Sequence, residues 1–397
     1  MESPLLFALN IATLIIIAFS TNLLILRSVD RQAYLPLAFC LLAIGVVICQ
    51  PSLVHLVPAL QSTVLIFSLP AILMIAPSFW FYVEAITAEK PWQMKDVAKR
   101  HFALAAIGGC VSIIALFIPY EVRYELLIAG NDNVLKTLDK PTLYIAVSSL
   151  LLTFLLVLGW VIQSGFYFYK VVKRLTRYRS HLKELFASTE AKEVRWLSWV
   201  IIAVGFVWLA TAVNIVLDNL FFSTQVNATA AGAVIFVMTW SIAIWGLRQK
   251  PGFEELYNSD IDLQTVLDDR VDVSEKYQRS ALDEQQAAKI AEKIESAMQN
   301  DKLYLDSMLS LQKLAKNIAT SPNYISQTLN ESLKMNFFDY VNKYRVEHAK
   351  HLLKQSDDTV LDIAMNSGFN AKSSFYTAFK KEVQQTPSQY RKSVAAG

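Results

Sequence analysis

Seven stretches within the first 250 residues are apolar over a length that can cross a lipid bilayer, and this feature constrains the fold more than any other. Backbone polar groups inside a bilayer must be satisfied within the protein, so single stretches of this length are expected to be helices. The sequence therefore predicts a seven-helix transmembrane bundle in residues 1–249. The expected spans are 5–26, 34–56, 63–86, 102–120, 142–169, 197–221 and 229–247.

Composition supports a chain in two parts. Hydrophobic residues make up 54% and the mean hydropathy is +0.34, which is too apolar for an average soluble protein. Nearly all of the excess precedes residue 250, and residues 251–397 have the composition of an ordinary soluble chain. The first span differs from a signal peptide because it lacks a basic leading region and is followed by Arg27 and Arg31. It is interpreted as a retained helix.

The distribution of Lys and Arg predicts how the bundle is oriented, because these residues favour the cytoplasmic side. One set of alternate loops holds fourteen of them: Arg27, Arg31, Lys90, Lys95, Lys99, Arg100, Lys170, Lys173, Arg174, Arg177, Arg179, Lys183, Lys192 and Arg195. The other set holds three: Arg123, Lys136 and Lys140. The protein is therefore expected in the cytoplasmic (inner) membrane, with its N-terminus outside and its C-terminus in the cytoplasm.

Few residues of the bundle suggest a ligand site. Glu84, Asn214 and Asp218 are ionisable or polar groups at membrane depth and are the ligand candidates, with helix packing as the alternative role. Prolines at positions 51, 70 and 77 are expected to kink helices and open a cavity. The three cysteines lie in apolar stretches, and no metal-binding, cofactor-binding or catalytic spacing is found.

Charge divides the part that follows the bundle into a connector and a domain. Residues 251–284 contain ten acidic and three basic residues, and residues 285–397 contain fifteen basic and eleven acidic residues. The sequence predicts an acidic linker over 250–284 and a separate domain over 285–397. A basic domain suits an anionic polymer as its partner.

A helix-turn-helix motif is predicted between residues 311 and 330. Leu311, Leu314 and Ile318 form the apolar stripe of a first helix. Ser321 and Pro322 then have the residue types of an N-cap and a first helical position. The second helix would direct four polar residues outward, as a recognition helix does. These are Asn323, Ser326, Gln327 and Asn330.

The same plan recurs about 48 residues later. A long helix over 337–354 leads to a short helix carrying Val360, Ile363 and Ala364. Gly368 lies in the turn that follows, where a positive φ is expected. Residues 371–382 form the last long helix, with Phe375 and Phe379 inward and four residues outward. The outward residues are Lys372, Ser373, Tyr376 and Thr377.

Two recognition helices on one stiff linker helix can enter successive major grooves, which lie about 34 Å apart on one face of DNA. Asn, Gln, Ser and Lys side chains bond to base edges there. Other polar groups of the domain are candidates for phosphate contacts, which supply salt-dependent affinity. The phosphate candidates are Asn330, Lys343, Arg345, Tyr376, Lys380, Lys381, Arg391 and Lys392.

These motifs resemble the AraC/XylS family of bacterial transcription regulators. The resemblance covers residues 301–391 and rests on Ile363-Ala364, Ser367-Gly368-Phe369, Phe379-Lys380-Lys381 and Thr386-Pro387-Ser388-Gln389-Tyr390-Arg391, together with Leu314-Ala315, Tyr324-Ile325-Ser326 and Tyr344-Arg345. It implies base contacts by Asn323, Ser326 and Gln327 in the first helix and by Lys372, Ser373 and Thr377 in the second. The chain departs from the family pattern at Lys334 and Gln384, where the family often has Gly.

The leading hypothesis is a one-component regulator without enzymatic activity, in which a stimulus at the membrane alters promoter binding. The alternatives are a transporter or membrane enzyme with a regulatory tail, and a passively anchored regulator. The expected partners are promoter DNA, the lipid bilayer, a small-molecule or lipid signal, a second copy of the chain and RNA polymerase. The basic loop 170–195 is expected either on anionic lipid or against the C-terminal domain.

Overall fold

The computed structural model describes residues 4–97, 99–190, 192–220, 227–257 and 283–395. The described chain is helical, as expected, and its one isolated β-bridge joins Phe186 to Ser310. It divides into two compact units. The first unit comprises Met1–Arg174 and Val194–Glu254, and the second comprises Leu175–Glu193 and Glu255–Gly397. The linker expected over 250–284 falls mostly outside the described residues.

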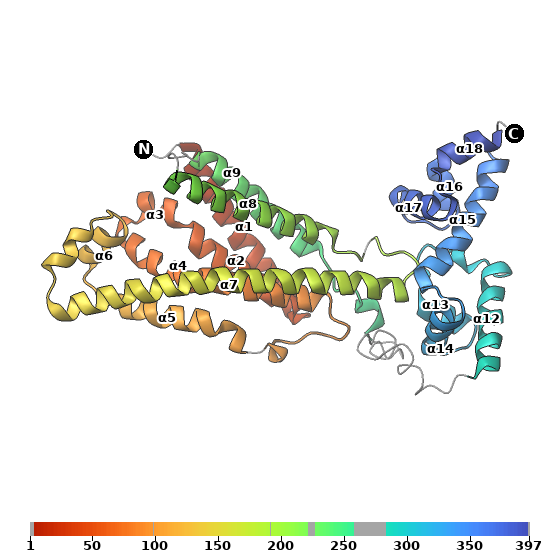
Figure 1. Cartoon of the computed structure of the whole chain (residues 1–397), viewed down its shortest axis with the longest axis horizontal. Coiled ribbons are helices and arrows are strands. Elements are labelled where there is room, and N and C mark those ends of the chain that lie inside the picture. The colour runs from red at the N-terminus through yellow and green to blue at the C-terminus, as the bar shows by residue number, and fades with distance from the viewer. Residues whose placement is uncertain (1–3, 98, 191, 221–226, 258–282, 396–397) are drawn as a thin grey trace. The chain divides into compact units, whose positions relative to one another are not determined.

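Each apolar segment of the sequence becomes a helix of the first unit (Figure 1). The helices that correspond to the expected spans are α1 (Pro4–Ser28), α2 with α3 (Leu35–Ile48 and Gln50–Leu56), α4 (Gln61–Ile86), α5 (Ala103–Ala115), α7 (Lys140–Leu185), α8 (Arg195–Leu220) and α9 (Ala228–Arg248). The shorter elements between them are η1 (Gln32–Tyr34), η2 (Pro58–Leu60), η3 (Met94–Asp96), η4 (Lys99–Phe102), α6 (Tyr120–Leu127), η5 (Asp132–Thr137) and η6 (Glu254–Leu256).

The number of helices able to cross a membrane is smaller than seven by length and composition. Within the described residues, four qualify: α1, the run Pro58–Ile86, α7 and α9. The pair α2 and α3 adds a fifth if its 54° bend lies within one span. Helix α5 has 13 residues, and the apolar part of α8 whose side chains are described, Arg195–Val207, is also short. The prediction of seven transmembrane helices is therefore not confirmed.

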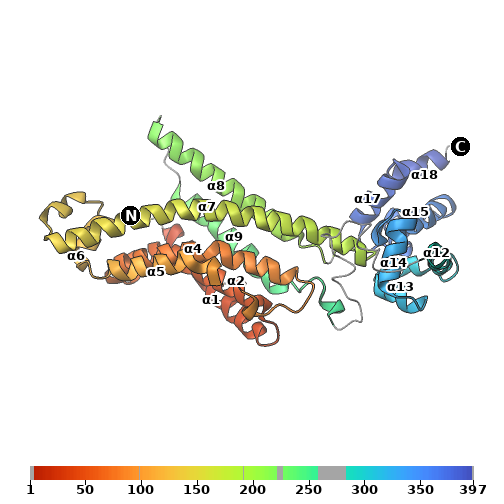
Figure 2. The same ribbon diagram turned by 60° about the horizontal axis from the view of Figure 1, so that its bottom comes forward.

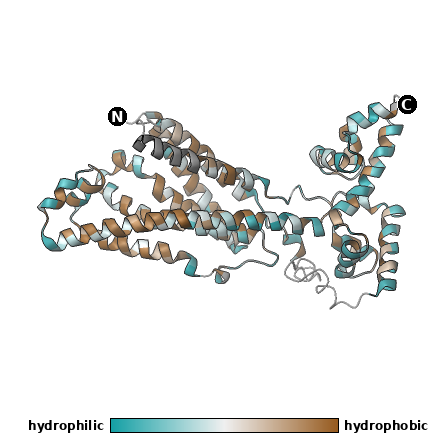
Figure 3. Ribbon diagram, viewed as in Figure 1, coloured by the Kyte–Doolittle hydropathy of each residue, from teal (hydrophilic) through white to brown (hydrophobic). Residues whose placement is uncertain are grey.

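Helix α4 is the centre of the packing in the first unit. It packs against α2 and α5, while α1 packs against α2 and α9. Helix α7 runs beside α5 in both views (Figures 1 and 2), and Leu73, Val111 and Leu156 join α4, α5 and α7 in one apolar cluster. On the outer face of α7, Phe154 and Ile162 are 60% and 75% exposed. Hydrophobic residues dominate these helices (Figure 3), as in a bundle that faces lipid.

Pro70 shapes the contact between α4 and α5. Its ring nitrogen has no hydrogen, so the carbonyl of Ile66 one turn earlier cannot bond to it. The hydroxyl of Ser112 on α5 donates to that carbonyl at 2.7 Å. Gly108 allows this approach, because a Cβ there would lie 3.0 Å from Leu73 Cδ1. The carbonyl that proline leaves free is thus satisfied by the neighbouring helix, which is how membrane helices accommodate proline.

The second unit contains the predicted C-terminal helices. They are α12 (Glu284–Gln299), α13 (Leu311–Asn317), α14 (Pro322–Gln327), α15 (Phe337–Gln355), α16 (Val360–Asn366), α17 (Lys372–Val383) and α18 (Pro387–Ala395), with a 3-10 turn η7 (Leu303–Leu305) and a π-helical turn η8 (Thr328–Ser332). The pair α13 and α14 forms the first helix-turn-helix module, and α16 and α17 form the second. Helix α15 joins them, so the predicted plan of two modules on a linker helix is confirmed.

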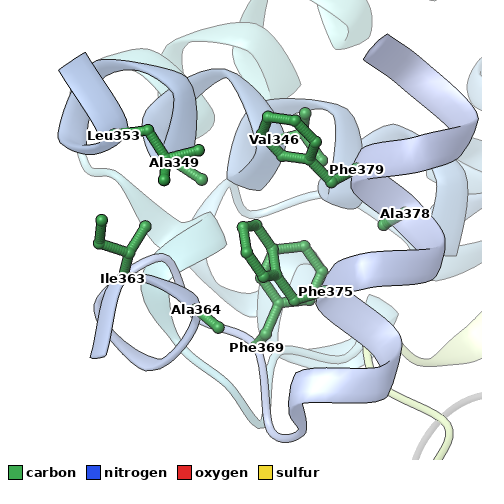
Figure 4. Close-up of a cluster of buried hydrophobic side chains, with 9 residues drawn as sticks. All are labelled: Val346, Ala349, Leu353, Ile363, Ala364, Phe369, Phe375, Ala378 and Phe379. Atoms are coloured by element: carbon green, nitrogen blue, oxygen red, sulfur yellow. The ribbon is translucent and has the colours of Figure 1, made fainter. Parts of the chain in front are cut away.

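A compact core holds the second module together. Figure 4 shows side chains from α15, α16 and α17 meeting in one cluster. Phe375 and Phe379 of α17 are fully buried, with ring centroids 5.4 Å apart, and Phe379 also contacts Tyr390 of α18. The cluster consists of Val346, Ala349, Leu353, Ile363, Ala364, Phe369, Phe375, Ala378 and Phe379. This core fixes α17 relative to the linker helix.

Five described residues of this unit have positive φ, including Lys302 and Ala319. Gly368 has φ +86°, as predicted, and a Cβ there would lie 2.4 Å from the carbonyl oxygen of Tyr304. Lys334 and Gln384 have φ values of 55° and 61°. They therefore adopt the left-handed conformation that the family pattern gives to Gly, at a cost of about 1–2 kcal/mol for a residue with a side chain. Gln384 is the C-cap of α17, and Lys334 lies two residues after η8, the turn that follows α14.

Candidate nucleic-acid interface

Helix α17 presents its predicted base-reading residues to solvent. Lys372, Ser373 and Thr377 are exposed near its N-terminal end, whereas Phe375 and Phe379 are buried. The hydroxyl of Thr377 donates to the Ser373 carbonyl at 2.9 Å, and its lone pairs remain available to a donor. The helix thus combines a buried apolar face with a polar face that is open along its first turns.

Several phosphate candidates surround this face. Lys380 and Lys392 are exposed, and Lys381 forms an ion pair with Asp339 at 2.7 Å while remaining 59% exposed. Arg391 is half-buried and donates to the Asp358 carbonyl at 2.7 Å, and the Tyr376 hydroxyl lies 3.4 Å from Ser388 Oγ. A hollow of about 470 Å³ is lined by Tyr376, Thr377, Lys380, Lys381, Gln384 and Thr386. Cationic and hydroxyl groups therefore converge beside α17, as a phosphate contact requires.

Helix α14 differs from α17 in the exposure of its predicted readers. Ser326 and Gln327 are 2% and 4% exposed, so the prediction that they face outward is wrong for this structure. Asn323 and Asn330 are half-buried. The face of α14 is covered because α12, which is not part of the helix-turn-helix pattern, packs against α14 and η8. Gln327 donates to Glu331 at 3.1 Å, within the same turn.

Residues 175–193 provide a second cover for this module. Leu182, Leu185 and Phe186 are at most 4% exposed, and the amide of Ala187 donates to the Leu309 carbonyl at 3.1 Å. Asn330 donates to the Glu184 carboxylate at 3.2 Å. Of the two places expected for the basic loop, its contact with the C-terminal domain is confirmed. We call residues 182–188 the docking segment.

Arg345 is not a phosphate-binding residue in this structure, and that prediction is corrected. Its side chain is fully buried, and its Nε and Nη2 donate to the carbonyls of Tyr304 and Asp306 at 2.7 and 2.9 Å. Its Nη1 donates to the Ala187 carbonyl and the Ser188 hydroxyl, each at 3.0 Å. Burial lowers the pKa of Arg345 to about 10, so the group remains cationic at neutral pH. It joins the docking segment to the linker helix. Lys343, two residues earlier, is exposed.

Asp306 and His348 lie close to this buried network. Burial by itself raises the pKa of Asp306, but the hydrogen bonds from Lys313 and the Met308 amide hold that pKa below its ordinary value. Burial lowers the pKa of His348, with a further contribution from Lys302 and His351. The imidazole of His348 stacks near Tyr304 with ring centroids 5.7 Å apart.

Of the three ligand candidates in the first unit, the structure describes the side chain of Glu84 only. Glu84 is half-buried, and its charge acts on Lys170. The side chains of Asn214 and Asp218 lie outside the described residues. Within the part of the chain that the structure describes, no group of three metal-binding side chains is found. Arg123, which the sequence marks only as one of three basic residues on its set of loops, is 8% exposed beside an apolar cavity.

The second unit is similar in sequence to known helix-turn-helix proteins. The family profile described as a helix-turn-helix domain matches residues 314–393. An HTH-type transcriptional regulator of Staphylococcus aureus is 39% identical over 89 residues, and the melibiose operon regulatory protein of Escherichia coli is 32% identical over 87 residues. The match lies on the two modules and the linker helix described above. Residues 314–393 are an AraC-type helix-turn-helix domain.

The chain shares only part of its length with these relatives. Each match covers 22% of the chain, and it spans 12% of the Staphylococcus aureus relative and 29% of the melibiose regulator. Among solved structures, the C-terminal domain of the two-component response regulator yesN from Fusobacterium nucleatum is 34% identical, with a TM-score of 0.23. The aligned region covers 26% of this chain and 95% of the yesN domain. The two sequence relatives are named as a transcriptional regulator and an operon regulatory protein, and the residues matched by the family profile belong to the second unit.

Proposed function

We propose that the protein is a membrane-embedded, sequence-specific DNA-binding transcription regulator that couples a stimulus at the membrane to promoter binding. The observation that carries the proposal is the open polar face of α17 in an AraC-type domain whose chain also holds at least four helices long enough to cross a bilayer. The distribution of positive charge favours a cytoplasmic location for the domain, where promoter DNA is found.

The two recognition helices have different roles in this proposal. Helix α17 contacts base edges through Lys372, Ser373 and Thr377, and the nearby lysines contact phosphates. Helix α14 reads the adjacent major groove once its polar face is uncovered. Paired half-sites on DNA would also suit a second copy of the chain, bound beside the first and near RNA polymerase.

The docking segment supplies the coupling. It consists of the last turn of α7 and the residues directly after it, yet its Glu184 accepts a hydrogen bond from Asn330 after the first reader. A stimulus that favours release of this segment frees the polar face of α14, and one that favours docking keeps it covered. Such a stimulus acts only through a difference in affinity for the two states.

Selection of duplexes from a randomised DNA pool, with the full chain in detergent, tests the DNA-binding part. We expect an enriched motif with two half-sites about 10–10.5 base pairs apart. Lys372→Ala should weaken binding to that motif by about 1–3 kcal/mol while leaving binding to random DNA nearly unchanged. Lys289→Ala, which removes an equal charge from the exposed face of α12, is the control. Enrichment of no motif would contradict the proposal.

Glu184→Ala tests the coupling. This change removes the acceptor for Asn330, so we expect tighter binding to the selected motif by the full chain. Glu347→Ala, an exposed carboxylate paired with Lys350 on α15, is the matched control and should leave the affinity unchanged. Equal affinities of the wild type and the Glu184 variant, both folded, would show that the docking segment does not restrict DNA binding.

A further inference from the structure

The first unit contains a cavity of about 310 Å³ between α4, α5, α6 and α7. Its walls are almost entirely apolar and include Leu69, Val111 and Leu126. Ile66, whose carbonyl is left free by Pro70 one turn later on α4, also lines the cavity. A cavity near a proline of this helix was expected from the sequence.

Arg123 is the one charged residue among the described residues that line this cavity. Arg123 of α6 is 8% exposed and lines the wall. Among the described residues, neither its Nε nor its Nη1 has a hydrogen-bond partner, although both atoms are buried. Val122 and Leu126 hold α6 in an apolar cluster with α5 and α7, which keeps the guanidinium in place. An unpaired buried guanidinium is strongly unfavourable, so an anion is the missing element.

A second orphaned polar atom lines the same cavity. The hydroxyl of Ser149 on α7 lines the cavity, is buried and has no hydrogen-bond partner among the described residues. A carboxylate accepts two parallel bonds from a guanidinium and has lone pairs left for a hydroxyl donor. The two orphaned groups are therefore complementary to one small anion, with apolar walls extending away from it.

We infer that this cavity binds an anionic amphiphile, with its anionic group on Arg123 and its alkyl chain between α4, α5 and α7. Free fatty acids and anionic phospholipids share this chemistry. The volume favours a fatty acid, because 310 Å³ is near the lower end of the range of about 300–1,000 Å³ for ligand pockets and suits one chain better than two. Leu150 and Val157, which line the cavity, are 40% and 41% exposed on α7, so the alkyl chain can enter from the lipid side.

That this ligand serves as the stimulus rests on the proposed function, whereas the binding site itself does not. The two are separated by measuring ligand binding directly. The full chain is placed in nanodiscs of zwitterionic phosphatidylcholine, and binding of radiolabelled decanoate and palmitate is measured by equilibrium dialysis. DNA binding of the same preparation is measured separately.

We expect saturable binding of the fatty acid to the wild type and a loss of affinity of about 10- to 100-fold in Arg123→Met, from removal of charge-assisted hydrogen bonds. Arg123→Lys should recover part of the affinity. Lys136→Met, which removes an exposed cation from the neighbouring turn η5, should bind as the wild type does. The methyl ester of the same acid, which lacks the charge, should bind no more tightly to the wild type than to Arg123→Met.

Stability without ligand distinguishes a binding role for Arg123 from a structural one. Because its guanidinium is unpaired, Arg123→Met should melt at the same temperature as the wild type or higher, and added fatty acid should raise the melting temperature only of chains that keep the arginine. A lower melting temperature of the ligand-free variant, or equal binding of acid and ester, would overturn the inference. Absence of saturable binding in phosphatidylcholine nanodiscs would overturn it too, and displacement of the bound acid by added phosphatidylglycerol would overturn the assignment to a fatty acid.

Discussion

The buried Arg345 and the exposed Lys343 are two residues apart on the same helix, and the structure predicts opposite consequences for their loss. Both carry a positive charge, and from the sequence alone both are phosphate candidates. The structure assigns Arg345 to the interior, where four hydrogen bonds of 2.7–3.0 Å join it to residues 187, 188, 304 and 306. Arg345→Met should therefore act on stability, and Lys343→Met on DNA affinity.

The magnitude follows from the groups that each change leaves behind. Without the guanidinium, the carbonyls of Tyr304, Asp306 and Ala187 lose a charged donor, while the cost of burying that charge also disappears. Breaking a buried charged network by removing one member typically costs about 3–5 kcal/mol, a large part of the 5–15 kcal/mol that stabilises a domain. Lys343→Met should change stability by no more than about 0.5 kcal/mol.

Hydrogen exchange measures the first effect in the full chain. All eight tryptophans precede residue 250, so their fluorescence does not report on the second unit directly, whereas amide exchange in α13 and α15 does. A loss of 3–5 kcal/mol accelerates exchange of the most protected amides about 10²- to 10⁴-fold. Binding to random duplex at several salt concentrations measures the second effect, and Lys343→Met should lower the salt slope by about 1. A lower salt slope in Arg345→Met, with exchange unchanged, would refute this reasoning.

Three further predictions concern stability. Gln384→Gly removes a side chain from a residue with φ 61° and should stabilise the second unit by about 0.5–1 kcal/mol, measured by exchange, with destabilisation contradicting the strain argument. The pKa of His348 lies below its ordinary value of 6.5, so the stability it contributes is complete above that pH and is lost as the pH falls through the lower folded-state pKa. His348→Gln should flatten this dependence, and an unchanged profile would exclude it. Ser112→Ala leaves the Ile66 carbonyl without its donor and should destabilise the first unit by about 0.5–2 kcal/mol, measured by tryptophan-monitored melting. Ser148→Ala, at an exposed serine of α7, is the control. An equal effect of both substitutions would count against the Ser112 hydrogen bond.

Much of the fold follows from local patterns in the sequence. Every apolar segment became a helix within a few residues of its expected ends, apart from the shorter α5 and the longer α7, because hydrophobic length and periodicity are local properties. The positive φ of Gly368 was also predictable, since its turn joins two amphipathic helices. The number of membrane crossings was not, because a bend such as that between Ile48 and Gln50 depends on the packing around it.

The candidate site was predicted less completely. The exposed face of α17 follows from the spacing of Phe375 and Phe379, whose burial turns Ser373 and Thr377 outward. The burial of Ser326 and the role of Arg345 depend on residues far away in the chain, and a periodicity confined to one helix contains no information about them. Arg123 was visible in the sequence only as a cation in a loop set otherwise poor in cations.

Arg345 also bears on how such proteins are assembled in evolution and in the laboratory. The module matched by the family profile begins at residue 314. Two of the hydrogen-bond acceptors of its buried Arg345 belong to residues 187 and 188, which precede the module by more than a hundred positions. A chimera that takes only residues 314–393 would therefore leave Arg345 without these two acceptors and without the carbonyls of Tyr304 and Asp306, which also precede the module. Grafting this reader onto another receptor requires transplanting the short stretch between α7 and α8 with it.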